Sequence, residues 1–127
     1  MADAIKKEEL DQYCAMINID SLGLGTPQVA HNLSSKKLEE EAAEQAKKLQ
    51  MPFGNASITG GDSDSSSFIK RKIPALMIHG MSNNWATILH SVNDNPAKVD
   101  AQSVYLGYRL ALLLLAVIQE KPCGAYK

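Results

Sequence analysis

The stretch covering residues 13–23 constrains the fold more than any other part of this sequence. A mostly apolar run leads into Asn18 and Asp20, and the chain then breaks at Gly23. A short apolar strand that ends in a carboxylate and a glycine is typical of an α/β protein, in which ligands bind in the crevice at the carboxyl ends of the strands. Because both faces of this strand are largely apolar, we expect it to be central and covered on both sides.

The remaining pattern predicts one layered domain over residues 1–127. A chain of 127 residues with 45% apolar residues is long enough to bury a core of its own. Further strands are expected at residues 27–32, 55–59 and 73–78, and helices at residues 35–49, 66–72 and 98–120. This alternation predicts an α/β/α arrangement around a mixed, mostly parallel sheet.

Burial can also be anticipated for several side chains. The helix expected at residues 35–49 is apolar on one side, so its acidic run at residues 39–41 should be a solvated face. The apolar stretch at residues 110–118 should be deeply covered. Cys14 lies in the apolar strand and should behave as a small buried thiol, and a bridge to Cys123 is not expected from spacing alone.

Charge and hydropathy bear on partners and on location. The net charge is −1, and no basic run carries interleaved aromatic residues, so no nucleic-acid partner is expected. The most apolar stretch has nine residues, whereas a membrane span needs about 20, so no membrane partner is expected either. The N-terminus has no apolar region typical of a signal peptide, which predicts a cytoplasmic chain as given, or a secreted or periplasmic one if an upstream half carries a signal.

Asp20 and His90 are the main candidates for chemistry. Asp20 ends a strand, where an acid either ligates a metal, acts as a base or simply caps a turn. His90 precedes a polar turn, and Asp94 is placed to orient one of its ring nitrogens. His90 is otherwise a surface histidine, and His79 and His31 are rivals for the same role.

The serine-rich segment at residues 61–67 is weaker evidence for a metal or catalytic site. Its Asp62 and Asp64 have the spacing that begins a calcium loop, but the other ligands of an EF-hand are missing. No Gly-x-Ser-x-Gly nucleophile motif occurs in the chain, so the serines are read as a flexible polar loop. One aspartate and one histidine supply two ligands, whereas a catalytic zinc normally has three from the protein.

Three blocks in order resemble the co-catalytic di-zinc aminopeptidases, a family related to glutamate carboxypeptidase and glutaminyl cyclase. The first block looks like the family's Asn-x-Asp-x-x-Gly strand end, the second like its Ser-Asp block followed by Ile-Pro-Ala, and the third like its His-Thr-x-x-Asp block. Their positions here are Asn18, Asp20 and Gly23; Ser63, Asp64 and residues 73–75; and His90, Ser91 and Asp94.

The resemblance implies a zinc-dependent peptidase. Asp20 would ligate one zinc ion and His90 the other, while Asn18, Asp64 and Asp94 would support the metals or lie at the substrate end. Ser65 stands where the family usually has a histidine, and the two ligand positions are unaffected.

The resemblance covers only the C-terminal half of such an enzyme. Members of the family carry a further histidine, a metal-bridging aspartate and a Glu-Glu pair upstream, and Glu8-Glu9 is not in that setting. The resemblance therefore implies a fold that is incomplete relative to the full peptidase, no catalytic base in this chain, and little activity alone. A peptide substrate is expected only once an N-terminal half completes the site.

An incomplete fold also bears on association, and other functions remain open. Unpaired strand edges and exposed apolar surface should lead the chain to form a homo-oligomer or to exchange elements with a copy of itself. The alternatives to a peptidase are a non-catalytic binding or assembly module on the same scaffold and an unrelated small α/β ligand-binding domain.

Overall fold

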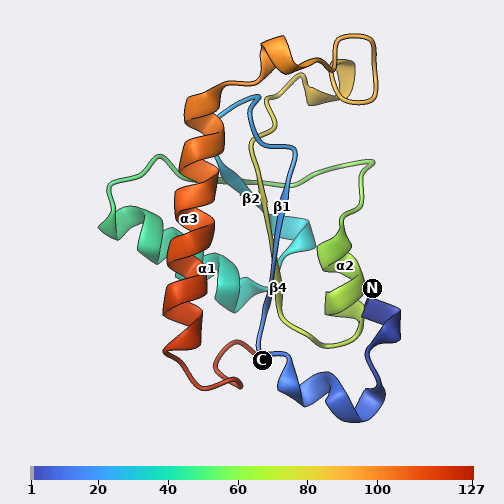
Figure 1. The fold of residues 1–127 in the computed structure, drawn as a ribbon, viewed down its shortest axis with the longest axis vertical. Helices are drawn as coiled ribbons and strands as arrows, with labels where there is room; N and C mark the ends of the chain where they lie inside the picture. The colour runs from blue at the N-terminus through green and yellow to red at the C-terminus, as the bar shows by residue number, and fades with distance from the viewer. Residues whose placement is uncertain (1) are drawn as a thin grey trace.

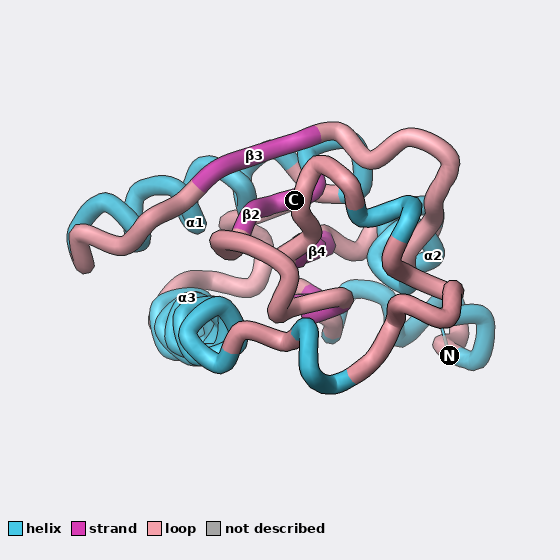
Figure 2. The backbone as a smooth tube through the Cα atoms, turned by 90° about the horizontal axis from the view of Figure 1, so that it is seen from above, coloured by secondary structure: helices cyan, strands magenta, loops and turns pink. Residues whose placement is uncertain are grey.

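The computed structural model describes residues 2–127 as a four-stranded sheet with helices on both faces (Figures 1 and 2). The spatial order of the strands is β1-β4-β2-β3. Their bounds are β1 Met16–Asp20, β2 Gln28–Ala30, β3 Gly54–Ala56 and β4 Ala75–His79. β1 runs parallel to β4 and β2 parallel to β3, while β2 and β4 are antiparallel. The expected mixed, mostly parallel sheet is thus confirmed.

Three α-helices complete the layers. α1 (Lys36–Lys48) and α3 (Ala101–Gln119) lie on one face of the sheet, and α2 (Asp64–Lys70) lies on the other (Figure 2). Short 3₁₀ turns occupy the N-terminal segment and the loops, at Ala2–Ala4, Lys7–Gln12, His31–Leu33, Trp85–Thr87 and Pro96–Lys98. The α/β/α layering matches the sequence-based expectation.

The ends of the helices follow local side-chain chemistry. Asp100 caps α3 because its Oδ1 accepts a hydrogen bond from the backbone N–H of Gln102 at 3.0 Å. α2 begins two residues earlier than expected, since Ser63 accepts from the N–H of Ser65 and acts as its N-cap. Ser35 precedes α1, but its Oγ instead accepts from the N–H of Ala75 at 3.0 Å and so ties the helix start to the central sheet.

The central strand is β4, so the expectation for residues 13–20 was wrong. All five residues of β4 are buried, and the strand lies between β1 and β2. β1 is an edge strand that pairs only with β4 among residues 2–127, and 47% of Ile19 is exposed. Apolar residues on both faces of a strand indicate that both faces are covered. They do not show whether another strand pairs with each of its two edges.

α3 is covered on one side only. Leu110, Leu114 and Ile118 are buried against the sheet, whereas Leu112 and Leu115 are each 48% exposed. Uniform apolarity over residues 110–118 therefore does not mean that the helix is surrounded here. α3 is also the one described helix with the length and hydropathy of a membrane span, a criterion that core helices meet as well.

The acidic run of α1 is not the solvated face that its composition predicts. Glu39 and Glu41 are buried, and only Glu40 between them is exposed. Glu39 contacts His31 Nδ1 at 2.7 Å, and Glu41 accepts from Gln45 Nε2 at 2.6 Å. Buried carboxylates need such partners, and these partners come partly from segments that the sequence does not show to be near.

The two cysteines form a disulfide bond, which corrects the expectation of a free thiol at Cys14. Their Cα atoms lie 4.5 Å apart although 109 positions separate them in sequence. The bond joins the approach to β1 with the segment that follows α3. Spacing alone could not predict it, because the fold brings both positions to the same end of the molecule.

Candidate functional site

Asp20 and His90 line the same pocket, at the end of the sheet where β1 and β4 have their carboxyl ends. The pocket has a volume of about 310 Å³ and is lined in part by Asp20, His90, Asp94 and Trp85. β1 ends at Asp20, which pairs in register with His79 at the end of β4. His90 comes from the long loop between β4 and α3, drawn in yellow to orange in Figure 1. Two side chains seventy positions apart in sequence thus line one pocket.

The two side chains are held by local backbone geometry. Ser21 has a left-handed conformation with φ of 52°, and its Oγ donates to Asp20 Oδ1 at 3.0 Å. His90 also has a positive φ of 60°, and its backbone N–H donates to Asp94 Oδ2 at 3.2 Å. Asp94 therefore positions the backbone of His90, whereas the sequence predicted a contact with the imidazole ring. Non-glycine residues with positive φ are uncommon and cluster at functional sites.

Two of the other predicted site residues, Asn18 and Asp64, lie outside this pocket. Asn18 lies on the same face of β1 as Asp20, but it does not line the pocket, and its Nδ2 donates to Ser63 Oγ at 3.2 Å. Asp64 is the exposed first residue of α2 and does not line the pocket. Asp62, two positions earlier, does line it. Hydrogen bonds from Ser66 and from the backbone of Ser63 lower the pKa of Asp62. The supporting or substrate-end role of Asp64 stays a prediction.

His79 is buried beside the pocket, not exposed in it. Only 2% of His79 is exposed, and its Nδ1 accepts from the N–H of Met81 at 3.2 Å. Burial lowers the pKa of His79, and the nearby Asp20 carboxylate opposes that shift. The third histidine, His31, pairs with Glu39 on another part of the surface. His90 is accordingly the histidine that shares a pocket with Asp20.

The residues that the structure describes do not complete a zinc site. A catalytic zinc normally takes three protein ligands, and a co-catalytic pair takes more. Within residues 2–127, no three histidine, cysteine, aspartate or glutamate side chains are grouped so that they could hold a metal ion. Asp20 and His90 are chemically suitable as a carboxylate and an imidazole ligand, but they are too few.

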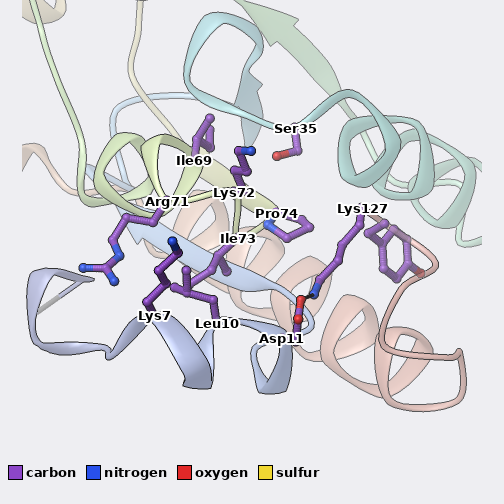
Figure 3. Close-up of a pocket in the computed structure, with 11 residues that line it drawn as sticks. Lys7, Leu10, Asp11, Ser35, Ile69, Arg71, Lys72, Ile73, Pro74 and Lys127 are labelled. Carbon is purple, nitrogen blue, oxygen red and sulfur yellow. Dashed lines mark hydrogen bonds and ion pairs between the residues drawn. The ribbon is translucent and has the colours of Figure 1, made fainter.

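A larger pocket lies at the opposite end of the strands, just before the first residue of β4 (Figure 3). Its volume is about 580 Å³, and Lys7, Arg71 and Lys72 stand around an apolar floor that includes Ile73. Arg71 donates to the carbonyl oxygen of Ile5, so it anchors the N-terminal segment. None of the residues that the sequence singled out for chemistry lines this pocket.

The structure places an acid at the end of a parallel-paired strand and a loop histidine on the same pocket of an α/β fold. Comparison with family models then assigns the chain to a family. The model of Peptidase family M28 matches residues 1–114, and the chain belongs to this family. The resemblance to zinc aminopeptidases in the sequence is thereby confirmed.

Solved structures agree on the fold. The aminopeptidase LapA of Legionella pneumophila superposes with a TM-score of 0.75 at 17% identity, covering 91% of this chain and 35% of LapA. BSAP, a zinc aminopeptidase from Bacillus subtilis, gives 0.70 at 16% identity, with 98% and 33% covered. An aminopeptidase from Aneurinibacillus sp. strain AM-1 gives 0.66 at 22% identity, with 93% and 28% covered.

This chain therefore spans about a third of the length of the proteins that it resembles in structure. At these identities the likeness concerns the fold. A comparison with curated protein sequences found no match.

Proposed function

We propose that this chain supplies part of a zinc-dependent aminopeptidase site, which hydrolyses N-terminal peptide bonds. Asp20 and His90 are the proposed metal ligands. The observation that carries the proposal is their meeting on one pocket at the carboxyl ends of the strands, in a chain of family M28. Asn18, Asp64 and Asp94 are proposed as supporting positions, of which Asp94 acts on the backbone of His90.

We also infer that the chain has little peptidase activity by itself. Two ligands cannot hold a pair of metal ions, and no three candidate side chains among the described residues are grouped so that they could hold even one. The remaining ligands and the carboxylate base would have to come from a separate partner or from further chain. A peptide substrate is proposed for the completed site, because zinc aminopeptidases share this fold.

Zinc titration calorimetry on point variants tests the ligand assignment. We expect the wild-type chain to bind zinc weakly, and Asp20→Ala or His90→Ala to weaken binding by more than about tenfold. His31→Ala is the matched control, because His31 contacts a glutamate away from the pocket. Binding that depends on His31, and not on His90, would contradict the assignment. Hydrolysis of leucine anilide by the chain alone would contradict the inferred inactivity.

A non-catalytic binding or assembly module on the same scaffold is the second candidate. Its supporting observation is that the described residues lack a three-ligand cluster while one face of the molecule is apolar and open. This candidate predicts that Asp20→Ala and His90→Ala leave zinc binding unchanged. The calorimetric comparison therefore separates the two functions.

A further inference from the structure

His79 carries a hydrogen-bond donor that no group in the described residues satisfies. Only 2% of His79 is exposed, and its Nδ1 accepts a hydrogen bond from the N–H of Met81 at 3.2 Å. A neutral imidazole ring with an accepting Nδ1 carries its proton on Nε2. Nε2 is itself buried, and no atom of residues 2–127 accepts a hydrogen bond from it. A buried donor without a partner costs free energy and calls for an explanation.

His79 lines a pocket that is distinct from the one containing Asp20 and His90. This pocket, which we call the His79 pocket, has a volume of about 210 Å³. Gln28 lines it from β2, directly opposite His79 in the register of β2 and β4. Its other lining residues come from two loops, at residues 56–58 and 81–85. The pocket is therefore built within the sheet and its loops, far in sequence from either end of the chain.

The charges around the His79 pocket select a neutral ligand. No aspartate, glutamate, lysine or arginine lines it. The Asp20 carboxylate lies close enough to raise the pKa of His79, although the larger effect of burial lowers that pKa and keeps the ring neutral. A carboxylate ligand would thus lose its water without gaining a cation, and Asp20 would repel it. A neutral group with a strong hydrogen-bond acceptor meets neither obstacle.

We propose that the His79 pocket binds a neutral primary carboxamide, whose carbonyl oxygen accepts the hydrogen bond from Nε2 of His79. The amide N–H groups of the ligand can donate to the side-chain oxygens of Ser57 and Asn83, which also line the pocket. Because Nε2 is covered, the carbonyl oxygen reaches it only when a lining side chain changes rotamer. Met81 lines the pocket, and its unbranched, flexible side chain suits this movement.

The His79 pocket adjoins the pocket of Asp20 and His90. Ile58, Met81 and Trp85 line both pockets and form the wall between them. In the proposed peptidase, the bound carboxamide would therefore be an amide side chain of the substrate, a step that rests on the proposed function. Binding of a free carboxamide requires no metal, so its success or failure is separate from that of the zinc assignment.

Butyramide and butyrate are matched probes for the proposal, because they have nearly the same size and shape and differ in charge. We expect a nuclear magnetic resonance titration of the chain with butyramide to shift the Nε2–H signal of His79. The backbone amide signals of residues 56–58 and 81–85 should shift with it. Butyramide should bind at least about tenfold more tightly than butyrate, since only the amide satisfies the buried donor without burying a charge.

His79→Phe removes the donor and keeps an aromatic ring, and it should weaken butyramide binding by at least about tenfold. His31→Phe is the matched control, because His31 contacts Glu39 away from the pocket, and it should bind like the wild type. Circular dichroism shows whether each variant is folded, and the Nε2–H signal of the wild type decides the question if His79→Phe is not. Three results would each overturn the proposal: an Nε2–H signal that butyramide does not move, equal binding of butyrate, or unchanged binding by folded His79→Phe.

Discussion

Glu41 shows how a single buried residue connects two parts of the molecule. Only 6% of Glu41 is exposed, and its carboxylate accepts hydrogen bonds from Gln45, Tyr126 and Lys121. Burial alone would raise the pKa of Glu41, but the donors outweigh it and the pKa is lowered. The same contact raises the pKa of Lys121. The charged pair thus holds the segment after α3 against α1.

Replacing Glu41 should reduce the free energy of unfolding and should make that free energy less dependent on pH in the acid range. We expect Glu41→Gln to lower the free energy of unfolding by about 1.5–3 kcal/mol at neutral pH, since it weakens hydrogen bonds to a charged group. A carboxylate whose pKa is lower in the folded state stabilises the fold at pH values above its unfolded pKa of about 4.3. This stabilisation is lost as the pH falls through the folded pKa. Urea unfolding across that range should show a steeper acid-side loss for the wild type than for the variant.

Glu40→Gln is the control for this comparison. Glu40 is exposed and pairs with Lys36 one helical turn away, at 3.8 Å. Exposed pairs of this kind contribute about 0.3–0.5 kcal/mol. An equal loss of stability in both variants would show that the buried network has no special role.

Among the elements, the end of β4 is packed more closely than its sequence indicates. Gly80 follows β4 and accepts a hydrogen bond from Leu24, while its own N–H donates to Ser21. A Cβ at Gly80 would lie 2.9 Å from Ser103 Oγ on α3 and 3.0 Å from the carbonyl oxygen of Gly25. β4, α3 and the loop after β1 therefore meet at a point with no space for a side chain.

A methyl group at this junction should be costly. We expect Gly80→Ala to lower the free energy of unfolding by about 1–3 kcal/mol, because two of the nearest atoms, the carbonyl oxygen of Gly25 and the N–H of Gly23, belong to backbone that is hydrogen-bonded to Ser103 Oγ. Gly124→Ala is the control, since no atom lies within 4 Å of its added Cβ. Thermal unfolding of the two variants measures the difference. Equal stability would mean that the junction can relax.

The predictability of each element depended on where its partners lie. α1, α3 and β4 were predicted close to their observed bounds, because capping residues and apolar periodicity are local signals. The edge position of β1 and the half-exposed state of α3 were not predicted, because they depend on which elements lie alongside. Asp20 and His90 were singled out from residue type and position, and the structure places both on one pocket, while their role as metal ligands stays a prediction. Asp62 also lines that pocket, and no local signal separates it from Asp64.

For the whole molecule, the disulfide between Cys14 and Cys123 changes the expected environment. Structural disulfides persist in oxidising compartments and are rare in the cytosol. We propose an oxidising location for this protein, such as the periplasm or the exterior of the cell. An ion pair between Asp11 and Lys127, at 2.6 Å, joins the same two segments.

Removing the disulfide should destabilise the entire fold. The bond closes a loop across 109 positions, and loss of a native disulfide costs about 2–5 kcal/mol. Cys14→Ser with Cys123→Ser should therefore unfold at a lower urea concentration than the oxidised wild type. Adding reductant should bring the wild type to the level of the double variant and leave that variant unchanged. A wild type whose stability is insensitive to reductant would contradict this expectation.

The same bond decides how the molecule would respond to mechanical pulling. The sheet and all three α-helices lie between Cys14 and Cys123 in sequence, so they sit inside a covalently closed ring. A force applied on either side of that ring passes through the sulfur atoms. The strands inside it bear no load, and only segments outside the two cysteines are free to be drawn out.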